Sequence, residues 1–231
     1  MTKDKEVKAT AAKKKVYEFD KAKAYPITEA IEMIKKFSTV KFDASVEVHM
    51  NLGIDPRKGD QQVRSAVSLP HGTGKTIKVA AFVAPDQEEA CKQAGADLVG
   101  GEDLINKIKL SEKTDFAVAV ADPTMMKHLA KIAKILGTRG LMPSPKNETV
   151  STNPAKAVAE LKKGKVSFKN DDTSNLHVAI GKVSFDADKL KANFETIIEA
   201  VKKSKPATSK GSYLKNVTIC STMGPGIKVQ L

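Results

Sequence analysis

Short apolar runs alternate with amphipathic stretches through the middle of the chain. The runs TIKVAAFVA (76–84) and DFAVAVA (115–121) are continuous and rich in small and β-branched residues, as parallel strands buried on both faces are. A shorter strand is expected at ADLVGG (96–101). Helices are expected between and after these strands, over residues 85–95, 101–109 and 122–137. This β-α-β pattern predicts a small parallel sheet with right-handed crossovers.

The helix expected over 122–137 has signals at both ends. Asp122 is the expected N-cap, Pro123 the first helical residue and Gly137 the stop. Its apolar residues recur at helical spacing: Met125, Met126, Leu129, Ile132, Ala133 and Leu136.

The two flanking parts of the chain differ from the middle because apolar and polar residues alternate there with period two. Strands are expected over residues 44–54, 61–69, 164–171, 175–185 and 212–223. Helices are expected over 27–37, opened by Thr28, and over 186–206. This pattern predicts an antiparallel sheet backed by helices.

Charge supports a division into two domains. Residues 68–159 carry 12 basic and 10 acidic residues, whereas the rest of the chain carries 27 basic and 17 acidic residues. We therefore expect a nearly neutral α/β domain (68–159) inserted into a basic, discontinuous α+β domain (1–67 and 160–231). The chain would cross at LPHGTGK and return near Asn153-Pro154, and two adjacent hinge strands would permit relative motion of the domains.

The formal net charge of +12 favours an anionic partner, either nucleic acid or an acidic membrane surface. Only three of the basic residues are arginines, and lysines suit phosphate backbones better than base edges. No apolar run approaches the length of a membrane span, and the first residues lack the apolar core of a secretory signal, so a basic arm in a cytosolic protein is expected there.

Cysteines and histidines give no sign of a metal or catalytic cluster. Cys91 and Cys220 are far apart and are expected to be buried, reduced thiols. The four histidines are scattered along the chain: His49, His71, His128 and His177.

The stretch GTGKT at 72–76 superficially resembles a phosphate-binding loop. A Walker loop requires a glycine five residues before Gly74, where Leu69 stands, and the loop precedes a strand and not a helix. The turn after Val83 also lacks the glycines of a dinucleotide site. A nucleotide-dependent enzyme is therefore the weaker alternative, and a basic protein that binds nucleic acid by charge alone is a second one.

Two stretches contain apolar side chains in polar surroundings. In STVKFDASVEV (38–48), Phe42 lies beside Lys41 and Ser45, and it would either stack on a base or ribose or pack under the preceding helix. In STMGPGIKV (221–229), glycines and a proline break the strand after Thr222 and Met223, which leaves either a ligand contact or a plain turn.

Two polar loops also remain open to two interpretations. Asn170, Asp171 and Thr173 in FKNDDTSNLH (168–177) could bind RNA 2′-hydroxyls or only form a hairpin turn. The loop LGTRGLMPSPK (136–146) could contact an anion through Arg139 and Lys146, or it could be a rigid cap on the preceding helix.

Together these stretches closely resemble the bacterial large-subunit ribosomal protein L-one family, and the resemblance covers nearly the whole chain beyond about Ala22. It is carried by FDASVEVHMNLGIDPRKGDQQVRSAVSLPHGTGK, AGADLVGGEDL, LGTRGLMPSPK, NDDTSNLHVAIGKVSFDADKL and STMGPG. The resemblance implies a discontinuous α+β domain with an inserted Rossmann-like three-layer α/β domain, joined by a two-strand hinge.

The resemblance also implies a function on the ribosome. Members bind the 23S rRNA stalk beside the tRNA exit site, move with it as deacylated tRNA leaves, and in many bacteria repress their own operon mRNA. It implies a cytoplasmic protein of the large ribosomal subunit that is a monomer when free, with no catalytic activity, no cofactor, no metal and no membrane partner.

The RNA-facing positions that the resemblance implies are Lys41, Phe42, Ser45, Asp171, Thr173, Thr222, Met223 and Gly224. Phe42 and Met223 would pack on ribose and base faces, Lys41 would meet a phosphate, and the hydroxyl and carboxylate groups would form hydrogen bonds. The chain departs from the family pattern at Thr138, Ser144 and Asp172, where Pro, Asn and Lys are usual.

Overall fold

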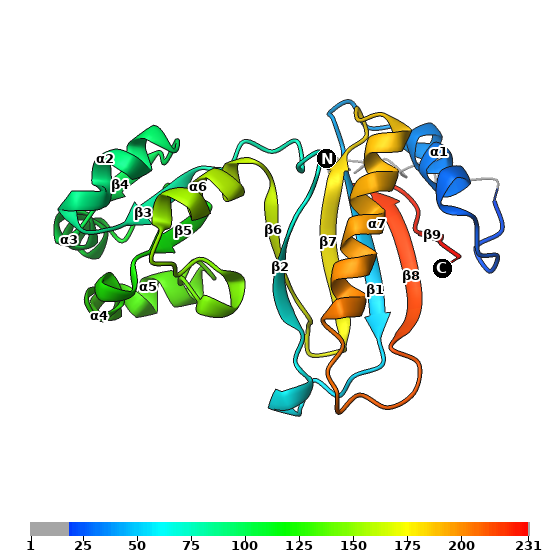
Figure 1. The fold of residues 1–231 in the computed structure, drawn as a ribbon. Coiled ribbons are helices and arrows are strands. Elements are labelled where there is room, and N and C mark those ends of the chain that lie inside the picture. Colours follow the sequence, from blue (N-terminus) through cyan, green and yellow to red (C-terminus); the bar gives the residue numbers. More distant parts are fainter. Residues whose placement is uncertain (1–18, 231) are drawn as a thin grey trace, which may run out of the picture.

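The computed structural model describes residues 19–230, and the expected basic arm lies almost wholly outside them. Two groups of elements lie side by side and are connected by two strands (Figure 1). One group is built around an antiparallel sheet and the other around a parallel sheet, so the expected fold class is confirmed. None of the helices in the described part of the chain is long and apolar enough to cross a membrane.

The antiparallel sheet has the strand order β7-β1-β8-β9. Its strands are β1 (Ser45–Leu52), β7 (Asn175–Lys182), β8 (Leu214–Ser221) and β9 (Ile227–Lys228). The central strand β1 pairs with β7 on one side and with β8 on the other. Residues before and after the parallel-sheet segment therefore complete a single sheet.

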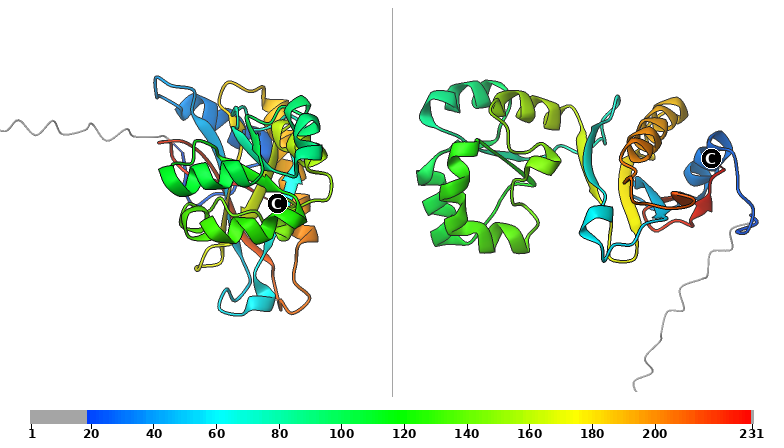
Figure 2. Two further views of the ribbon diagram at one scale, coloured as in Figure 1. Left: turned by 90° about the vertical axis from the view of Figure 1, so that its left-hand side faces the viewer. Right: turned by 60° about the horizontal axis from the view of Figure 1, so that its bottom comes forward.

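Two helices cover one face of this sheet, α1 (Ile27–Phe37) and α7 (Ala187–Lys203) (Figure 2). Alternate residues of the strands point at them, so Val46, Val48 and Met50 of β1 are buried. Glu47, His49 and Asn51 are only partly buried and lie on the opposite face, which no helix of the described residues covers. This alternation is the reason why one face forms the core and the other stays polar.

The parallel sheet has the order β4-β3-β5, with β3 (Val79–Phe82), β4 (Leu98–Gly100) and β5 (Val118–Ala121). Val79 and Ala81 face one apolar cluster, whereas Ala80 and Phe82 face another. The first cluster is covered by α2 (Pro85–Gln93) and α6 (Pro154–Lys162), and the second by α3 (Glu102–Ser111), α4 (Met126–Leu129) and α5 (Ala133–Thr138). Because β3 is buried on both faces, these elements form three layers.

Strands β2 (Arg64–Ser68) and β6 (Lys165–Lys169) pair with each other between the two groups (Figure 1). The chain enters the parallel-sheet segment along β2 and leaves it along β6. Arg64 Nε of β2 donates to Asn147 Oδ1 at 2.8 Å, and Lys165 Nζ of β6 contacts Glu148 and Glu160. Both strands are therefore also fixed to the parallel-sheet segment by side-chain contacts.

The GTGKT stretch belongs to the loop that follows β2, and its glycines serve close backbone packing. Gly72 and Gly74 have φ values of +63° and +70°, a conformation that glycine adopts without strain. A Cβ atom on Gly164, just before β6, would lie 2.4 Å from the Cα of Gly72. The two crossings of the chain thus touch through backbone atoms.

Asn193 of α7 fixes this loop to the antiparallel sheet. Its side chain is fully buried, its Nδ2 donates to Gly72 O at 2.9 Å and to Ile180 O at 2.7 Å, and its Oδ1 accepts from His71 N at 3.2 Å. One buried amide therefore satisfies backbone groups of both the loop and β7.

The turn between β6 and β7 is built around one carboxylate. Asp171 Oδ1 accepts from Thr173 N at 2.9 Å and from Asn175 N at 2.6 Å, and its Oδ2 accepts from Thr173 Oγ1 at 2.7 Å. The hydrogen bond from the Thr173 side chain and the backbone bonds lower the pKa of Asp171 to about 2. This is an Asx turn, which the charged form of the side chain stabilises.

Three local expectations differ from the structure. The expected helix over 122–137 is interrupted by 3₁₀ turns at Pro123–Met125 and Ala130–Ile132, because tighter turns around Ile132 keep the apolar side chains against the sheet. Asp122 precedes the first turn without capping its backbone; its side chain accepts from Thr124 instead. Helix α1 starts after Pro26 and not at Thr28, because the Pro26 carbonyl accepts from Ala30 N.

One α-helix and one strand of the structure were not expected, namely α6 and β9. In α6, Asn153 is a true N-cap that accepts from Lys156 N, and Pro154 is the first residue. The expected boundary at 159/160 lies inside this helix, and Leu161 still packs with the parallel sheet. We therefore propose that the inserted domain extends to the end of α6.

We predict that Asn193→Ala lowers the free energy of unfolding by about 2–4 kcal/mol, because it leaves one buried and two partly buried backbone groups without their partner. Urea unfolding measures this loss. The control is Glu195→Ala, an exposed position on the same helix, which should change stability by less than about 0.5 kcal/mol. Equal stability of the two variants would contradict the anchoring role of Asn193.

We predict that Asp171→Asn removes part of the acid sensitivity of folding. The pKa of Asp171 is lower in the folded chain than in the unfolded chain, so its contribution is complete above about pH 4 and is lost as the pH falls toward 2. Denaturation series between these pH values should show a shallower pH dependence for Asp171→Asn than for the wild type. The neighbouring Asp172→Asn is the control, and an identical slope in Asp171→Asn and wild type would refute this prediction.

Candidate nucleic-acid interface

Six of the eight expected RNA-facing residues meet at one end of the antiparallel sheet. β1 begins there and β8 ends there, so residue 45 lies beside residue 222. Thr222 N donates to Ser45 O at 2.9 Å, and Ser45 N donates to Thr222 Oγ1 at 3.2 Å. Residues 177 positions apart in the sequence thus form one hydrogen-bonded junction.

Phe42 and Met223 flank this junction and point into solvent. Among the described residues, only Phe42, Met223 and Leu110 are large apolar side chains classed as exposed, at 57%, 83% and 87%. Exposure of such side chains costs hydrophobic free energy, and a pair of them in one place is typical of a binding surface. The alternative that Phe42 packs under α1 is wrong.

Met223 also has a strained backbone. Its φ is +67°, which costs a residue with a side chain about 1 kcal/mol. Gly224 follows, and its N–H donates to Ser221 O at 2.8 Å to close the turn. A Cβ atom on Gly224 would lie 2.3 Å from Ser221 Oγ, so this position requires glycine. The turn therefore holds Met223 in one outward position.

Lys182 is a member of this cluster that the sequence did not reveal. Its Nζ donates to Ser45 Oγ at 3.2 Å and to Asp43 O at 3.1 Å. Its position opposite Ser45 follows from the pairing of β1 with β7, which no local pattern in the sequence predicts. Lys41 is exposed beside it, so two lysines lie at this end of the sheet.

Ser45 itself is 8% exposed, and its hydroxyl already accepts from Lys182. The α1–β1 turn is further fixed by Asp43, whose carboxylate accepts from Ser184 N at 3.2 Å and from Ser184 Oγ at 2.9 Å. The end of the sheet is therefore preorganised before any ligand binds.

The other two expected residues, Asp171 and Thr173, lie toward the opposite end of the sheet. Ser45 pairs with Lys182 and Asn51 pairs with Asn175, so the two ends of β1 are about 20 Å apart at the usual rise per residue. The Asp171 oxygens and the Thr173 hydroxyl form hydrogen bonds within the turn, and Asn175 Nδ2 donates to Thr173 Oγ1 at 2.8 Å. The hairpin-turn interpretation thus describes their local role.

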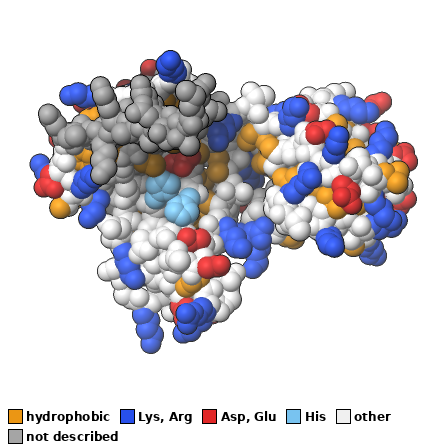
Figure 3. All heavy atoms as spheres, turned by 180° about the vertical axis from the view of Figure 1, so that it is seen from behind, with side chains coloured by type: hydrophobic (Ala, Val, Ile, Leu, Met, Phe, Trp, Pro, Cys, Tyr) orange, Lys and Arg blue, Asp and Glu red, His pale blue; other side chains and the backbone are white. Residues whose placement is uncertain are grey.

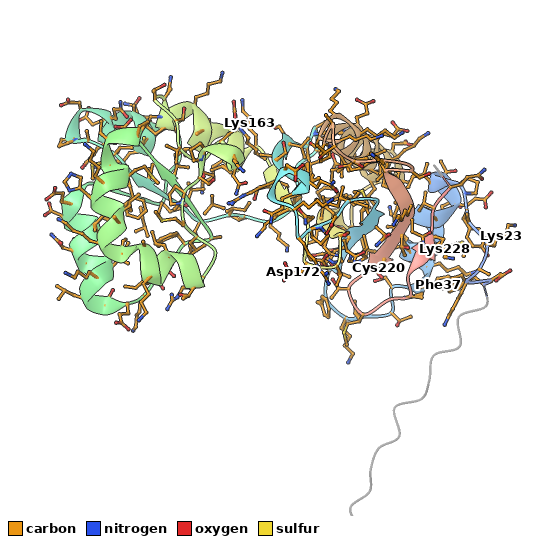
Figure 4. All side chains as sticks on the ribbon, turned by 90° about the horizontal axis from the view of Figure 1, so that it is seen from below. Lys23, Phe37, Lys163, Asp172, Cys220 and Lys228 are labelled. Atoms are coloured by element: carbon orange, nitrogen blue, oxygen red, sulfur yellow. The ribbon has the colours of Figure 1, made fainter. Side chains whose placement is uncertain are left out.

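The open face of the sheet connects these two ends. Two histidine side chains lie together on it (Figure 3), with His49 Nδ1 2.7 Å from His177 Nδ1. Cys220 of β8 is half-buried next to them (Figure 4). Two expectations are therefore wrong, since these histidines do form a cluster and Cys220 is not fully buried.

In the loop after α5, Arg139 acts as a cap, although on α3 and not on the preceding helix, whereas Lys146 is exposed. Arg139 donates to Glu112 O at 2.9 Å and to Thr114 Oγ1, so its guanidinium holds the end of α3. Thr138 Oγ1 donates to Lys134 O at 3.0 Å, and Ser144 exchanges hydrogen bonds with Thr149. The departures at Thr138 and Ser144 thus leave a well-bonded loop. Asp172 is exposed on the β6–β7 turn (Figure 4).

Comparison with known proteins identifies the family. The model of the ribosomal protein L1p/L10e family matches residues 34–225. Proteins named large ribosomal subunit protein uL1 are similar over most of their length. The one from Mycoplasma capricolum is 53% identical over 211 residues, 91% of this chain and 93% of that protein.

Two relatives from other bacteria show a similar identity and coverage. The protein of the same name from Solibacter usitatus is 49% identical over 219 residues, 95% of this chain and 91% of its own. The one from Chlamydia trachomatis is 52% identical over 211 residues, 91% of this chain and 90% of its own. The chain therefore belongs to the ribosomal protein L1p/L10e family and is a structural, non-enzymatic protein of the large ribosomal subunit.

Proposed function

We propose that the chain binds the 23S rRNA of the mobile stalk through the end of the antiparallel sheet where β1 begins and β8 ends. The observation that carries this proposal is the pair of exposed apolar side chains, Phe42 and Met223, on either side of the Ser45–Thr222 junction. A protein surface that bound only the phosphates of an RNA would need only lysine side chains. Two large apolar groups at a preorganised end of the sheet, one of them held outward by a strained turn, fit a ligand with ribose and base faces.

Each residue has a distinct part in this proposal. Phe42 and Met223 pack on ribose or base faces, and Lys41 contacts a phosphate, with Lys182 as a second cation beside it. Thr222 and the Gly224 backbone offer hydrogen bonds at close range. Ser45, which is buried, acts by positioning Lys182 and Thr222.

Asp171 and Thr173 stay in the proposed interface as the residues that shape its far end. Their side-chain oxygens are engaged within the turn, so they present the rigid β6–β7 turn to the RNA. With the two ends of β1 about 20 Å apart, the polar face of the sheet could follow an RNA segment of several nucleotides.

We further propose that the chain assists the release of deacylated tRNA from the exit site. The inserted domain is connected to the antiparallel domain through β2, β6 and the loop at Gly72 and Gly164. Two adjacent strands can bend together, which permits the inserted domain to move relative to a stalk that the other domain holds. In this proposal the free protein is a monomer, because RNA and not a second copy covers the exposed apolar side chains.

Repression of the protein's own operon mRNA is a second proposed function. The same surface would serve it, since an mRNA that reproduces the ribose and base arrangement of the stalk meets the same contacts. The proposal thus requires no further site on the protein.

A binder that acts by charge alone is the competing explanation for the basic composition. It predicts steep salt dependence, little preference among RNAs of equal length, and indifference to Phe42 and Met223.

We predict that Phe42→Ala and Met223→Ala each weaken binding to a stalk rRNA fragment by about 1–3 kcal/mol, because each removes one stacking surface. Leu110→Ala is the matched control, since Leu110 is equally exposed but lies on α3, away from the proposed surface. Filter binding at two salt concentrations, with an unrelated helix of equal length, measures affinity and specificity.

The wild type should prefer the stalk fragment by about 10³-fold or more. Equal binding of both RNAs, unchanged in the Phe42 and Met223 variants, would favour binding by charge alone and would overturn the proposed surface.

We predict that Gly224→Ala also weakens binding to the stalk fragment, because the new Cβ atom displaces the turn that positions Met223. Gly137→Ala is the control, since a Cβ atom there meets nothing within 4 Å. Fluorescence anisotropy and thermal unfolding are measured together. If Gly224→Ala keeps full affinity, the turn does not contribute to recognition.

A further inference from the structure

Three different metal-ligating side chains meet on the open face of the antiparallel sheet. Glu47 and His49 project from β1, and Cys220 projects from β8 directly opposite Glu47. One ligand atom of each residue lies within 4.8 Å of those of the other two. His49 Nε2 is 3.0 Å from Cys220 Sγ and 4.0 Å from Glu47 Oε2. All three are partly buried, so the group is reachable from solvent while held by strand pairing.

A relay of side chains fixes the orientation of His49. Its Nδ1 lies 2.7 Å from His177 Nδ1, the rings meet edge to face at 4.9 Å between centroids, and His177 Nε2 is 3.7 Å from Asp171 Oδ2. In the arrangement that satisfies both contacts, His177 carries its proton on Nε2 toward Asp171 and His49 donates from Nδ1. The lone pair of His49 Nε2 then points toward Cys220 and Glu47, as in a metal-ligating histidine with its supporting groups.

We propose that Glu47, His49 and Cys220 form a Zn²⁺ site on the open face of the sheet, supported by His177 and Asp171. A thiolate and an imidazole favour zinc over Mg²⁺ or Ca²⁺, which prefer oxygen ligands. Zinc ligands lie about 2.0–2.3 Å from the ion, so the three atoms need only small side-chain rotations to converge. Binding forms the zinc–sulfur bond and releases the Cys220 proton to solvent. With three protein ligands, the fourth position is open to water or to an external donor.

This proposal can be tested independently of the RNA-binding proposal, because it uses neither Phe42 nor Met223 and its experiments contain no RNA. Cobalt(II) is the first probe, since a thiolate ligand gives cobalt a sulfur charge-transfer band and a tetrahedral site gives intense visible bands. The RNA-free full-length protein should show both at one equivalent. A chromogenic chelator then measures the zinc affinity by competition.

Matched variants assign the ligands. Cys220→Ser should abolish the sulfur band and weaken zinc binding by at least about tenfold, whereas Cys91→Ser, which changes the buried thiol of α2, should leave both unchanged. His177→Ala should keep the sulfur band and weaken binding by about 10–100-fold, as loss of a supporting group does. Circular dichroism checks that each variant is folded.

The wild-type cobalt spectrum decides the proposal even if a variant does not fold. Absence of a sulfur band in the wild type, or its presence in Cys220→Ser at equal affinity, would overturn the assignment. Loss of the band in Cys91→Ser would place the metal at the other thiol and would overturn it as well.

Discussion

Strand β1 pairs with β7 on one side and with β8 on the other, and the rest of the architecture depends on this double pairing. Both partners come from the second half of the chain, so the first 70 residues cannot complete a sheet by themselves. The antiparallel core is therefore necessarily discontinuous, and the parallel-sheet segment must leave and return at one place. That place is the β2–β6 pair, where Gly72 and Gly164 allow the two crossings to touch. Asn193 then fixes the crossing loop to β7.

The same pairing creates the candidate RNA-binding surface. Ser45 and Thr222 lie side by side only because β1 and β8 are antiparallel neighbours, and Lys182 joins them only because β7 is the other neighbour. The strain at Met223 and the exposure of Phe42 are costs that the core does not require. Features that cost folding free energy and gather at one point are typical of functional sites.

Much of the fold follows from local patterns in the sequence. Continuous apolar runs predicted β3 and β5, because strands covered on both faces have no polar side, and alternation predicted β1, β7 and β8. The N-cap at Asn153 and the following Pro154 are signals for α6, but the same pair also fits the return crossing between the domains that is expected there. The break at Ile132 has no local signal, because its apolar spacing is that of an unbroken helix.

The candidate site likewise contains some residues that the sequence predicted and others that it did not. The polar surroundings of Phe42 and Met223 left two interpretations of each residue open, and only the resemblance to a family favoured the exposed, ligand-facing one. The assembly of His49, His177 and Cys220 did not, because it depends on strand register, and a shift of one residue would place them on opposite faces. Asp171 shows the limit of residue type as evidence, since its carboxylate accepts hydrogen bonds within its own turn and not only from a ligand.

The double pairing of β1 has a consequence for synthesis of the chain. During translation the parallel-sheet segment, complete by residue 162, can fold while β7 and β8 are still being made. Residues 41–45 leave the ribosome early but obtain their neighbours only when residues 222–224 have emerged. An interrupted chain can thus contain one folded domain and still lack the candidate RNA-binding surface, so on the proposed function a truncated product would not compete with intact protein for rRNA.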